Sequence, residues 1–428
     1  MNLKTKVVIG VILLSMIVLV IACSPRSRGS SETNILIIWA ASDSNIDPLV
    51  AQFQAENPQW DVRLTKYGWN DLHVRFIAGL SNPERNLPDV MTTPARTVGE
   101  FSILGGLEPV TEYKAQLGLP DTEWIPGVWD YFDAPGPDDV YRHYAIPGYW
   151  DGRAIFYRSD LYNAAGVGVG RTWDEFKANA ARVGNGDTVF GIGSLSGGID
   201  THWFQSILYS HGGRLNTPDG RTSLLDSPPA LTALRYYQSI YFDNIAPRDP
   251  ARRAGDPFVA FQQGYYATVH AGPWWFALIA ADPQLEGRWE VAPVPTVTQG
   301  AARAQYAHPN PWILPVGAQN KAGAYAWLNF MQRPEAQAEW FELSGNLPVR
   351  LASYNLNLAK GNRALENAIA VMLASGDYGY FSERNIANAN LIRNDAVIPM
   401  LDSVKNGEDV LVATRRAVDV MNRLLNDR

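Results

Sequence analysis

ILIIWAASDSNIDPLVAQFQAENPQWDVRLTKY (residues 35–67) contains a strand, a helix and a second strand in succession. Residues 35–39 form a short apolar run, which is typical of a buried strand in a parallel sheet. We expect a helix from Asp47, its N-cap, to about Asn57, with a proline at its first position. Residues 60–67 alternate between apolar and polar side chains, as a half-buried strand does. This alternation predicts the α/β class, with a mostly parallel sheet covered by helices.

The same alternation returns later in the chain. A T-x-x-E capping box at Thr172–Glu175 predicts a helix start, because its two side chains satisfy backbone amides that lack a helical partner. Further helices are predicted over residues 227–242, 320–331 and 409–425, and another opens at Asp256. With 428 residues, the chain is long enough for two ordinary domains and a large core.

Composition narrows the classes of function. Apolar residues make up 46% of the chain, which indicates a globular protein. Charged residues reach only 18%, whereas aromatic residues reach 11% and suit surfaces that are apolar on one side and wet on the other. The net charge is −7, and no run of Lys or Arg is longer than a pair. Nucleic acid is therefore excluded as a partner, because its binding requires a basic stripe.

The N-terminus has the pattern of a bacterial lipoprotein signal. Two lysines precede an apolar run over residues 7–22, which is shorter than the ~20 residues of a membrane-spanning helix. The only cysteine, Cys23, follows in the sequence VIAC. We predict that residues 1–22 are removed as a signal peptide and that Cys23 receives lipid; the alternative is a buried or free thiol. Residues 23–33 would then be a flexible tether, and the body would lie outside the cytoplasmic membrane, at the cell surface or in a periplasm.

Signatures of common enzymes are absent from the sequence. The six histidines include no H-x-x-x-H pair, and neither G-x-S-x-G nor G-x-x-x-x-G-K-[ST] occurs. The glycine-rich residues 166–170 fit a loop better than a nucleotide site. We therefore predict no catalytic residue, metal or cofactor. Carboxylates are numerous, so a glycosidase-type pair of carboxylates stays open as an alternative.

Segments spread over almost the whole chain carry a family resemblance. They are ILIIWAASDSNIDPLVAQFQAENP (35–58), LPDVMTT (87–93), AIFYRSDLYNAAGV (154–167) with TWDEF (172–176), FQQGYYATVHAGPWWF (261–276), WILPVGAQNKAGAYAWLNFM (312–331) and SGNLPVR (344–350). In their order and spacing the chain resembles the extracellular solute-binding proteins of bacterial ABC importers. Within them it is similar to the carbohydrate-binding family that includes maltodextrin-binding protein.

The resemblance implies a two-lobed periplasmic-binding-protein fold, with crossover hinge strands and a ligand cleft between the lobes. Lobe 1 would contain residues 34–153 and 306–350, and lobe 2 residues 154–305 and 351–428. The chain would cross near Asp151–Ala154, return around residues 300–306 and cross again near 350. Such lobes close on a ligand through rotations at a few hinge residues.

The Gly-Pro-Trp-Trp turn at residues 272–275 is the first candidate for ligand contact. We predict a strand over Tyr265–His270 and a helix that begins at Pro273, which places Trp274 and Trp275 at a helix start. An indole ring can stack on the apolar face of a sugar while polar groups bind its hydroxyls. In the family the Gly-Pro-Trp tryptophan, here Trp274, faces the cleft. The alternative is that both tryptophans belong to the core.

The other candidates follow strand ends or match family positions, because open α/β folds bind ligands at the carboxyl ends of their strands. They are Ser42, Asp43, Asn45, Thr93 with its neighbour Thr92, Trp150, Asp151, His202, Trp203, Asn310, Trp312, Arg350 and Arg384. Asp43 and Asp151 match acidic residues that bind sugar hydroxyls in the family. For each residue a cap, a loop or a core position is the alternative. Asn310 and Trp312 stand where relatives often have a glycine pair, so the sequence departs from the family pattern there.

The resemblance implies a lipid-anchored receptor that captures a mono- or oligosaccharide by hinge closure. Its partners would be the carbohydrate and the two permease subunits of an ABC importer, and we expect a monomer that is not an enzyme. Two alternatives stay open. One is a binding protein for a non-sugar solute such as an anion or a polyamine, and the other is a lipoprotein glycosidase that uses two carboxylates.

Overall fold

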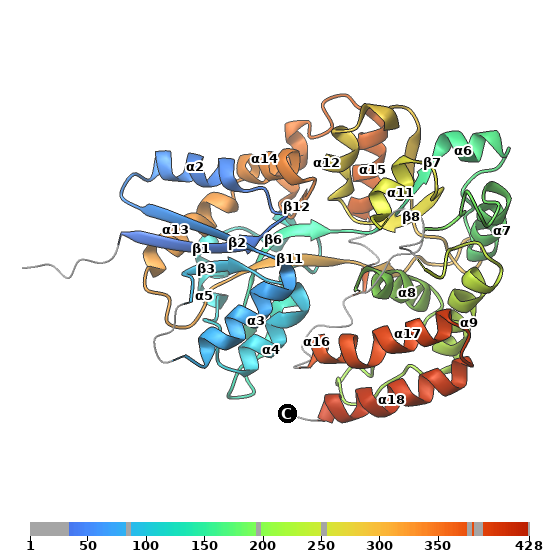
Figure 1. The fold of residues 1–428 in the computed structure, drawn as a ribbon. Helices are drawn as coiled ribbons and strands as arrows, with labels where there is room; N and C mark the ends of the chain where they lie inside the picture. Colours follow the sequence, from blue (N-terminus) through green and yellow to red (C-terminus); the bar gives the residue numbers. More distant parts are fainter. Residues whose placement is uncertain are drawn as a thin grey trace, which may run out of the picture.

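A computed structural model describes residues 34–82, 87–193, 198–249, 255–374, 379–380 and 388–426. The predicted signal peptide, Cys23, the tether and Arg384 lie outside these residues. Two α/β lobes lie side by side in Figure 1 and are joined by strands that run between them. Within the described residues, no helix combines the length and the apolar character needed to cross a lipid bilayer.

The first lobe is built on a six-stranded sheet. Its strands, in spatial order, are β12 (Leu347–Pro348), β6 (Ile146–Asp151), β11 (His308–Ile313), β3 (Val90–Thr92), β1 (Ile35–Ala41) and β2 (Asp61–Tyr67). Strand β1 is parallel to β2 and β3, but β11 is antiparallel to both β3 and β6, and β12 is antiparallel to β6. The sheet is therefore mixed rather than mostly parallel: β1, β2, β3 and β6 run in one direction, but two later segments, β11 and β12, run opposite to them.

Helices cover both faces of this sheet (Figure 1). They are α2 (Asp47–Glu56), α3 (Trp69–Leu80), α4 (Val98–Ile103), α5 (Thr111–Leu117), α13 (Lys321–Met331) and α14 (Pro334–Ser344). Helix α2 begins one residue earlier than predicted: Ile46 rather than Asp47 is its N-cap, and Asp47 forms an ion pair of 2.8 Å with Lys66. The small hairpin of β4 (Asp133–Pro135) and β5 (Tyr141–His143) lies between β3 and β6 in the sequence and pairs separately from this sheet.

The second lobe contains an antiparallel sheet in the order β8 (Thr268–Ala271), β7 (Ala154–Arg158) and β9 (Trp289–Ala292). Its helices are α6 (Ser159–Ala164), α7 (Trp173–Val183), α8 (Gly198–Ser210), α9 (Pro228–Phe242), α11 (Pro257–Gln262), α12 (Trp275–Ala280), α15 (Arg363–Ala374), α16 (Ala389–Leu391), α17 (Ile398–Lys405) and α18 (Val410–Asn426), with a π-helical segment η7 (Ile392–Val397) before α17. The predicted capping box is confirmed at the start of α7, where Thr172 and Glu175 bond each other's backbone amides. Asp256 caps α11 as predicted.

The chain passes between the two sheets at a few short connections. Only two residues separate the end of β6 at Asp151 from the start of β7 at Ala154. The chain returns through β10 (Gln305–Tyr306), which pairs with β13 (Gly379–Tyr380), and enters β11. It leaves the first sheet again after β12. These connections make the crossovers of a two-lobed fold, while the full lobe boundaries remain a prediction.

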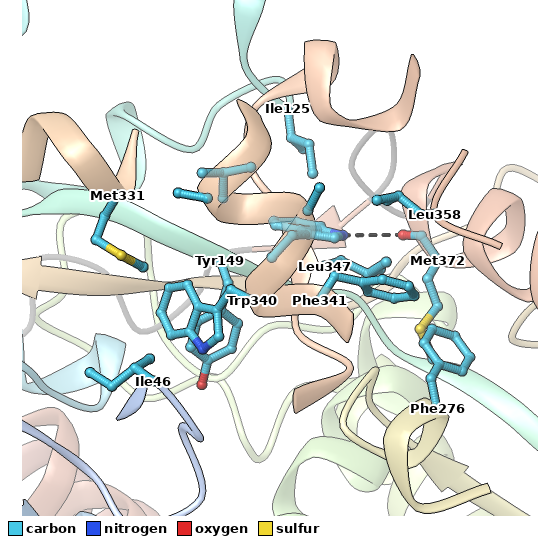
Figure 2. Packing of buried hydrophobic residues seen from close by; sticks show 14 of the residues in the cluster. Ile46, Ile125, Tyr149, Phe276, Met331, Trp340, Phe341, Leu347, Leu358 and Met372 are labelled. Carbon is cyan, nitrogen blue, oxygen red and sulfur yellow. Dashed lines mark hydrogen bonds between the residues drawn. The ribbon is translucent and has the colours of Figure 1, made fainter. Parts of the chain in front are cut away.

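An apolar core extends across the lobes on one side of these connections. Phe276 of α12 lies near Phe341 of α14, with ring centroids 6.2 Å apart. The indole Nε1 of Trp150 donates a hydrogen bond of 3.1 Å to the carbonyl oxygen of Met372 in α15, the dashed line in Figure 2. Leu347 and Leu358 pack in the same cluster (Figure 2). The two sheets are thus held together by buried side chains as well as by the chain itself.

Candidate functional site

A cavity of about 270 Å³ lies between the lobes. It is lined by Asp43, Trp69, Pro94, Ala95, Arg96, Tyr149, Asp151, Arg153, His202, Trp274, Tyr306, His308, Asn310 and Asn346. These residues come from the ends of β1 and β3, from β6, β10 and β11 at the crossovers, and from α8 and the turn after β8. The site therefore uses strand ends and crossover segments of both lobes, as open α/β folds do.

Asp151 is the carboxylate at the centre of the cavity wall. It ends β6 and is only 5% exposed. Its Oδ2 accepts a hydrogen bond of 3.0 Å from Nη2 of Arg153 and lies 3.5 Å from Nε2 of His308. Among the described residues its Oδ1 has no hydrogen-bond partner. Burial raises the pKa of Asp151 to about 6, although Arg153 and Asn310 favour the charged form, and Oδ1 can accept a hydrogen bond from a ligand hydroxyl.

Trp274 stands in the turn between β8 and α12. Strand β8 ends at Ala271 and α12 starts at Trp275, so Pro273 lies in the turn rather than at the first helical position that was predicted. The guanidinium of Arg153 lies over the Trp274 ring, 4.5 Å from its centroid. Gly272 allows the ring to fold back, because a Cβ at that position would collide with the Trp274 ring and lie 2.5 Å from Asp151 Oδ1.

Asp43 is held at the opposite rim by contacts within lobe 1. Its Oδ2 accepts a hydrogen bond of 3.2 Å from the indole Nε1 of Trp69, at the start of α3. The loop that carries Asp43 is held in place by α14, because Trp340 Nε1 donates a hydrogen bond of 2.7 Å to the carbonyl oxygen of Ser44. The cavity lining thus holds two carboxylates near indole rings: Asp43 is bonded by Trp69, and Asp151 and Trp274 both contact Arg153.

Helix α8 carries His202 to the cavity and is anchored by a buried carboxylate two residues earlier, Asp200. Asp200 is 4% exposed and accepts a hydrogen bond of 2.6 Å from the Tyr237 hydroxyl. Lys405 Nζ lies 3.9 Å from the same carboxylate. Burial raises the pKa of Asp200 from its ordinary 3.8 to about 6.

This raised pKa predicts a pH effect on stability. The folded state holds the Asp200 proton more tightly than the unfolded chain does, so the stabilising contribution is complete below pH 3.8 and is lost as the pH rises through about 6. We expect the free energy of unfolding of Asp200→Asn, relative to the unmodified protein, to increase between pH 4 and pH 7. Chemical denaturation of both proteins at the two pH values measures this difference, and a constant or decreasing difference would count against it.

Five of the residues proposed from the sequence line the cavity together. They are Asp43, Asp151, His202, Trp274 and Asn310. His202 stacks on Tyr306, with ring centroids 4.2 Å apart and an interplanar angle of 13°. The cavity therefore collects carboxylate, imidazole, amide and indole groups that are far apart in the sequence.

Four of the other proposed residues are tryptophans of the hydrophobic cores. Trp150 and Trp312 are fully buried, and Trp312 packs against Trp327 and Trp340. Trp203 packs against Trp173, while Trp275 packs among Phe156, Phe258 and Phe261. None of the four lines the cavity, because the neighbouring residue in the sequence, or the next but one, takes the cavity-facing position.

The remaining proposed residues have structural contacts outside the cavity lining. Ser42 bonds the backbone of Tyr67, and Asn45 bonds the carbonyl oxygen of Leu343. Thr92 bonds the amide of Ala41, and Thr93 bonds the Thr97 hydroxyl. Arg350 bonds the carbonyl oxygen of Gln332, lies over the Trp124 ring and pairs with Glu123. These contacts correspond to the loop and cap alternatives.

The structure adds cavity residues that the sequence analysis missed. They are Trp69, Pro94, Ala95, Arg96, Tyr149, Arg153, Tyr306, His308 and Asn346. Trp69 and Arg96 follow the carboxyl ends of β2 and β3, so the strand-end rule could have found them. Arg153, Tyr306 and His308 lie in crossovers, where the pairing of β10 and β11 with distant segments had to be known first.

The charges of the cavity lining balance. Asp43 and Asp151 are matched by Arg96 and Arg153. Burial, followed by the charge of Arg153, lowers the pKa of His202 and His308 well below the ordinary value, so both are neutral at pH 7. In the part of the chain that the structure describes, no group of three or more His, Cys, Asp or Glu side chains is placed to hold a metal ion. This lining favours a solute without net charge.

Comparisons with known proteins agree on the type of protein. The family model of the bacterial extracellular solute-binding proteins matches residues 39–338. A binding protein of Brucella abortus is 25% identical over 354 residues, covering 82% of this chain and 83% of the relative. A maltooligosaccharide ABC transporter solute-binding lipoprotein of Streptococcus pneumoniae is 20% identical over 440 residues, covering 99% of this chain and 98% of that protein.

A solved structure supports the fold directly. The GacH receptor of Streptomyces glaucescens, known unliganded and with acarbose, superposes with a TM-score of 0.78 at 23% identity, covering 92% of this chain and 98% of the receptor. At this identity the likeness concerns the fold. It agrees with the two-lobed fold.

Proposed function

Because the chain belongs to the bacterial extracellular solute-binding proteins, we propose that its cleft binds a neutral carbohydrate and delivers it to an ABC permease. The single observation that carries the proposal is the pairing of Trp274 and Asp151 in one cavity wall. An indole ring stacks on the C–H face of a sugar, and a carboxylate oxygen without a protein partner accepts hydrogen bonds from its hydroxyl groups. The balanced charges of the lining fit a neutral solute.

The cavity volume limits the size of the enclosed part of the solute. At about 270 Å³ it is near the lower end of the range of ligand sites. A mono- or disaccharide unit fits this scale better than a long chain does. The relatives' names support a saccharide as the class of solute, since one is a maltooligosaccharide ABC transporter solute-binding lipoprotein and one receptor is known with acarbose.

Transport requires binding without bond-making chemistry. The solute must bind the closed arrangement of the lobes better than the open one, and this difference drives closure. The partners in this proposal are two permease subunits, the protein acts as a monomer, and Cys23 carries the lipid that holds it outside the cytoplasmic membrane. A glycosidase would have to use Asp43 and Asp151, the two carboxylates of the cavity.

A thermal-shift screen tests the proposal. A solute that binds only the folded protein raises the melting temperature in proportion to the logarithm of its concentration. We expect a shift with at least one of glucose, maltose, maltotriose or other small saccharides, and loss of that shift in Trp274→Ala. Trp275 is a core residue, so Trp275→Phe is the matched control and should retain the shift.

Other outcomes separate the alternatives. A shift with a polyamine or a phosphate ester, and none with any saccharide, would replace the carbohydrate by a charged solute. Chromatography of the saccharide after incubation tests hydrolysis: new products that disappear in Asp151→Asn would establish an enzyme instead.

A further inference from the structure

Arg153 lies where the first crossover meets the cavity, and it touches four separate segments. It is 2% exposed. Its Nη2 donates to Asp151 Oδ2 and to His202 Nδ1, each over 3.0 Å. Its guanidinium lies over the Trp274 ring, and its backbone carbonyl accepts a hydrogen bond of 2.8 Å from Gln305. One side chain thus contacts three residues of the cavity lining.

The contact with His202 determines the form of the imidazole. A guanidinium has only donors, so His202 Nδ1 must accept, and it can do so only without a proton. A histidine that is unprotonated on Nδ1 is neutral and carries its proton on Nε2. The charge of Arg153 also opposes a second proton on the ring, and burial adds to this by lowering the pKa of His202.

We propose that Arg153 is a positioning residue that fixes His202 as the Nε2–H tautomer, so that the cleft offers a hydrogen-bond donor at His202 and an acceptor at Asp151. The part that concerns the solute rests on the proposed function. A solute would then place an acceptor oxygen, such as a ring or glycosidic oxygen, at His202 and a donating hydroxyl at Asp151. If the solute placed its hydroxyl donor at His202, two donors would face each other. If it placed its acceptor oxygen at Asp151, two acceptors would face each other.

The geometry also shows a cost that a packing role would not require. Among the described residues, Nε and Nη1 of Arg153 have no hydrogen-bond partner, although both atoms are buried. Unpaired buried donors destabilise a fold. A methionine of similar length would fill the space without that cost. The presence of an arginine at this position is therefore explained by the two hydrogen bonds of its Nη2, to Asp151 and to His202.

Charged and titratable groups from several elements lie near His202 and influence its protonation. They are Arg153 at the first crossover, Tyr306 in β10, which stacks on the ring, His308 in β11, Arg96 after β3 and Arg393 in η7. Asp151 is connected to His202 through Arg153. Arg153 is the group hydrogen-bonded to the His202 ring. Its removal should therefore change the tautomer, whereas the remaining positive groups still disfavour the imidazolium.

The test is ¹⁵N NMR of the purified protein labelled at histidine nitrogens, without added solute, at pH 7.5. Two-bond ¹H–¹⁵N correlations distinguish the two tautomers and the imidazolium, and His202→Gln assigns the signal. We expect the Nε2–H pattern for His202, and a mixture of tautomers in Arg153→Met. His211 is the internal control, because its Nδ1 faces the carbonyl oxygen of Ile207 at 2.7 Å and must carry a proton. Its signal should stay unchanged in the variant.

Two results would overturn the proposal: an Nδ1–H or imidazolium pattern for His202 in the unmodified protein, or an Nε2–H pattern that persists in Arg153→Met.

Arg153→Lys keeps the charge without the planar fork and should preserve the Nε2–H tautomer of His202 only in part. Because these readouts need no solute, they stand even if no saccharide binds. With a saccharide from the thermal screen, Arg153→Met should weaken binding by about tenfold or more. If Arg153→Met changes the His202 tautomer but binds the saccharide with unchanged affinity, the tautomer has no role in binding.

Discussion

Replacement of Gly272 by alanine is expected to weaken saccharide binding by about ten- to hundredfold while the chain stays folded. The added methyl group would collide with the Trp274 ring and lie 2.5 Å from Asp151 Oδ1. Both neighbours belong to the cavity wall, so relief of the collision must move the ring or the carboxylate from its position. Overpacking of this kind destabilises the folded state by about 1–3 kcal/mol. Here it also displaces the groups that bind the solute.

Calorimetric titration of Gly272→Ala with a saccharide from the thermal screen measures the effect. Gly168→Ala is the matched control, since no atom lies within 4 Å of its added Cβ. We expect the control to bind as the unmodified protein does. If Gly272→Ala binds with unchanged affinity, the Trp274–Asp151 wall is not the site of sugar contact.

Trp150→Ala is expected to lower the free energy of unfolding by about 3–5 kcal/mol. Trp150 is fully buried between the sheets, and its indole holds the carbonyl oxygen of Met372 in the other lobe. Removal leaves a large cavity and abolishes the hydrogen bond from the indole to that carbonyl oxygen. Urea denaturation measures this loss. Trp150→Phe keeps a ring but loses the hydrogen bond, so its free energy of unfolding should lie between those of the unmodified protein and Trp150→Ala.

Trp274→Ala is the counterpart of this variant. It removes a ring from the cavity wall rather than from the core, so affinity should fall with a smaller loss of stability. The opposite result, with Trp150→Ala folded normally but unable to bind, would restore the ligand role that the sequence suggested for Trp150.

Local sequence patterns predicted the elements of the fold well. The apolar run at 35–39, the capping box at Thr172 and the cap at Asp256 all correspond to observed elements. The direction of strands in the first sheet was not predictable in this way. Strands β11 and β12 join β6 from segments more than 150 residues further along the chain, and no short-range pattern encodes that pairing.

The candidate site shows a second limit of reasoning from sequence. Strand ends and the family resemblance pointed to pairs of neighbours, such as Trp150 with Asp151 and Trp274 with Trp275. Successive residues of a strand point to opposite faces, and successive residues of a helix start point about 100° apart. Only one member of each pair can line the cavity. Periodicity along β6 could have favoured Asp151, but only the structure shows that the face opposite Trp150 is the cleft.

A crystal structure of the protein grown with a saccharide from the thermal screen tests the central claim most directly. The account predicts one sugar ring between the lobes, stacked on Trp274, with a hydroxyl group on Asp151 Oδ1 and an acceptor oxygen toward His202. A sugar bound outside the interlobe cavity, or a bound sugar in the cavity without contact to Trp274 and Asp151, would contradict it.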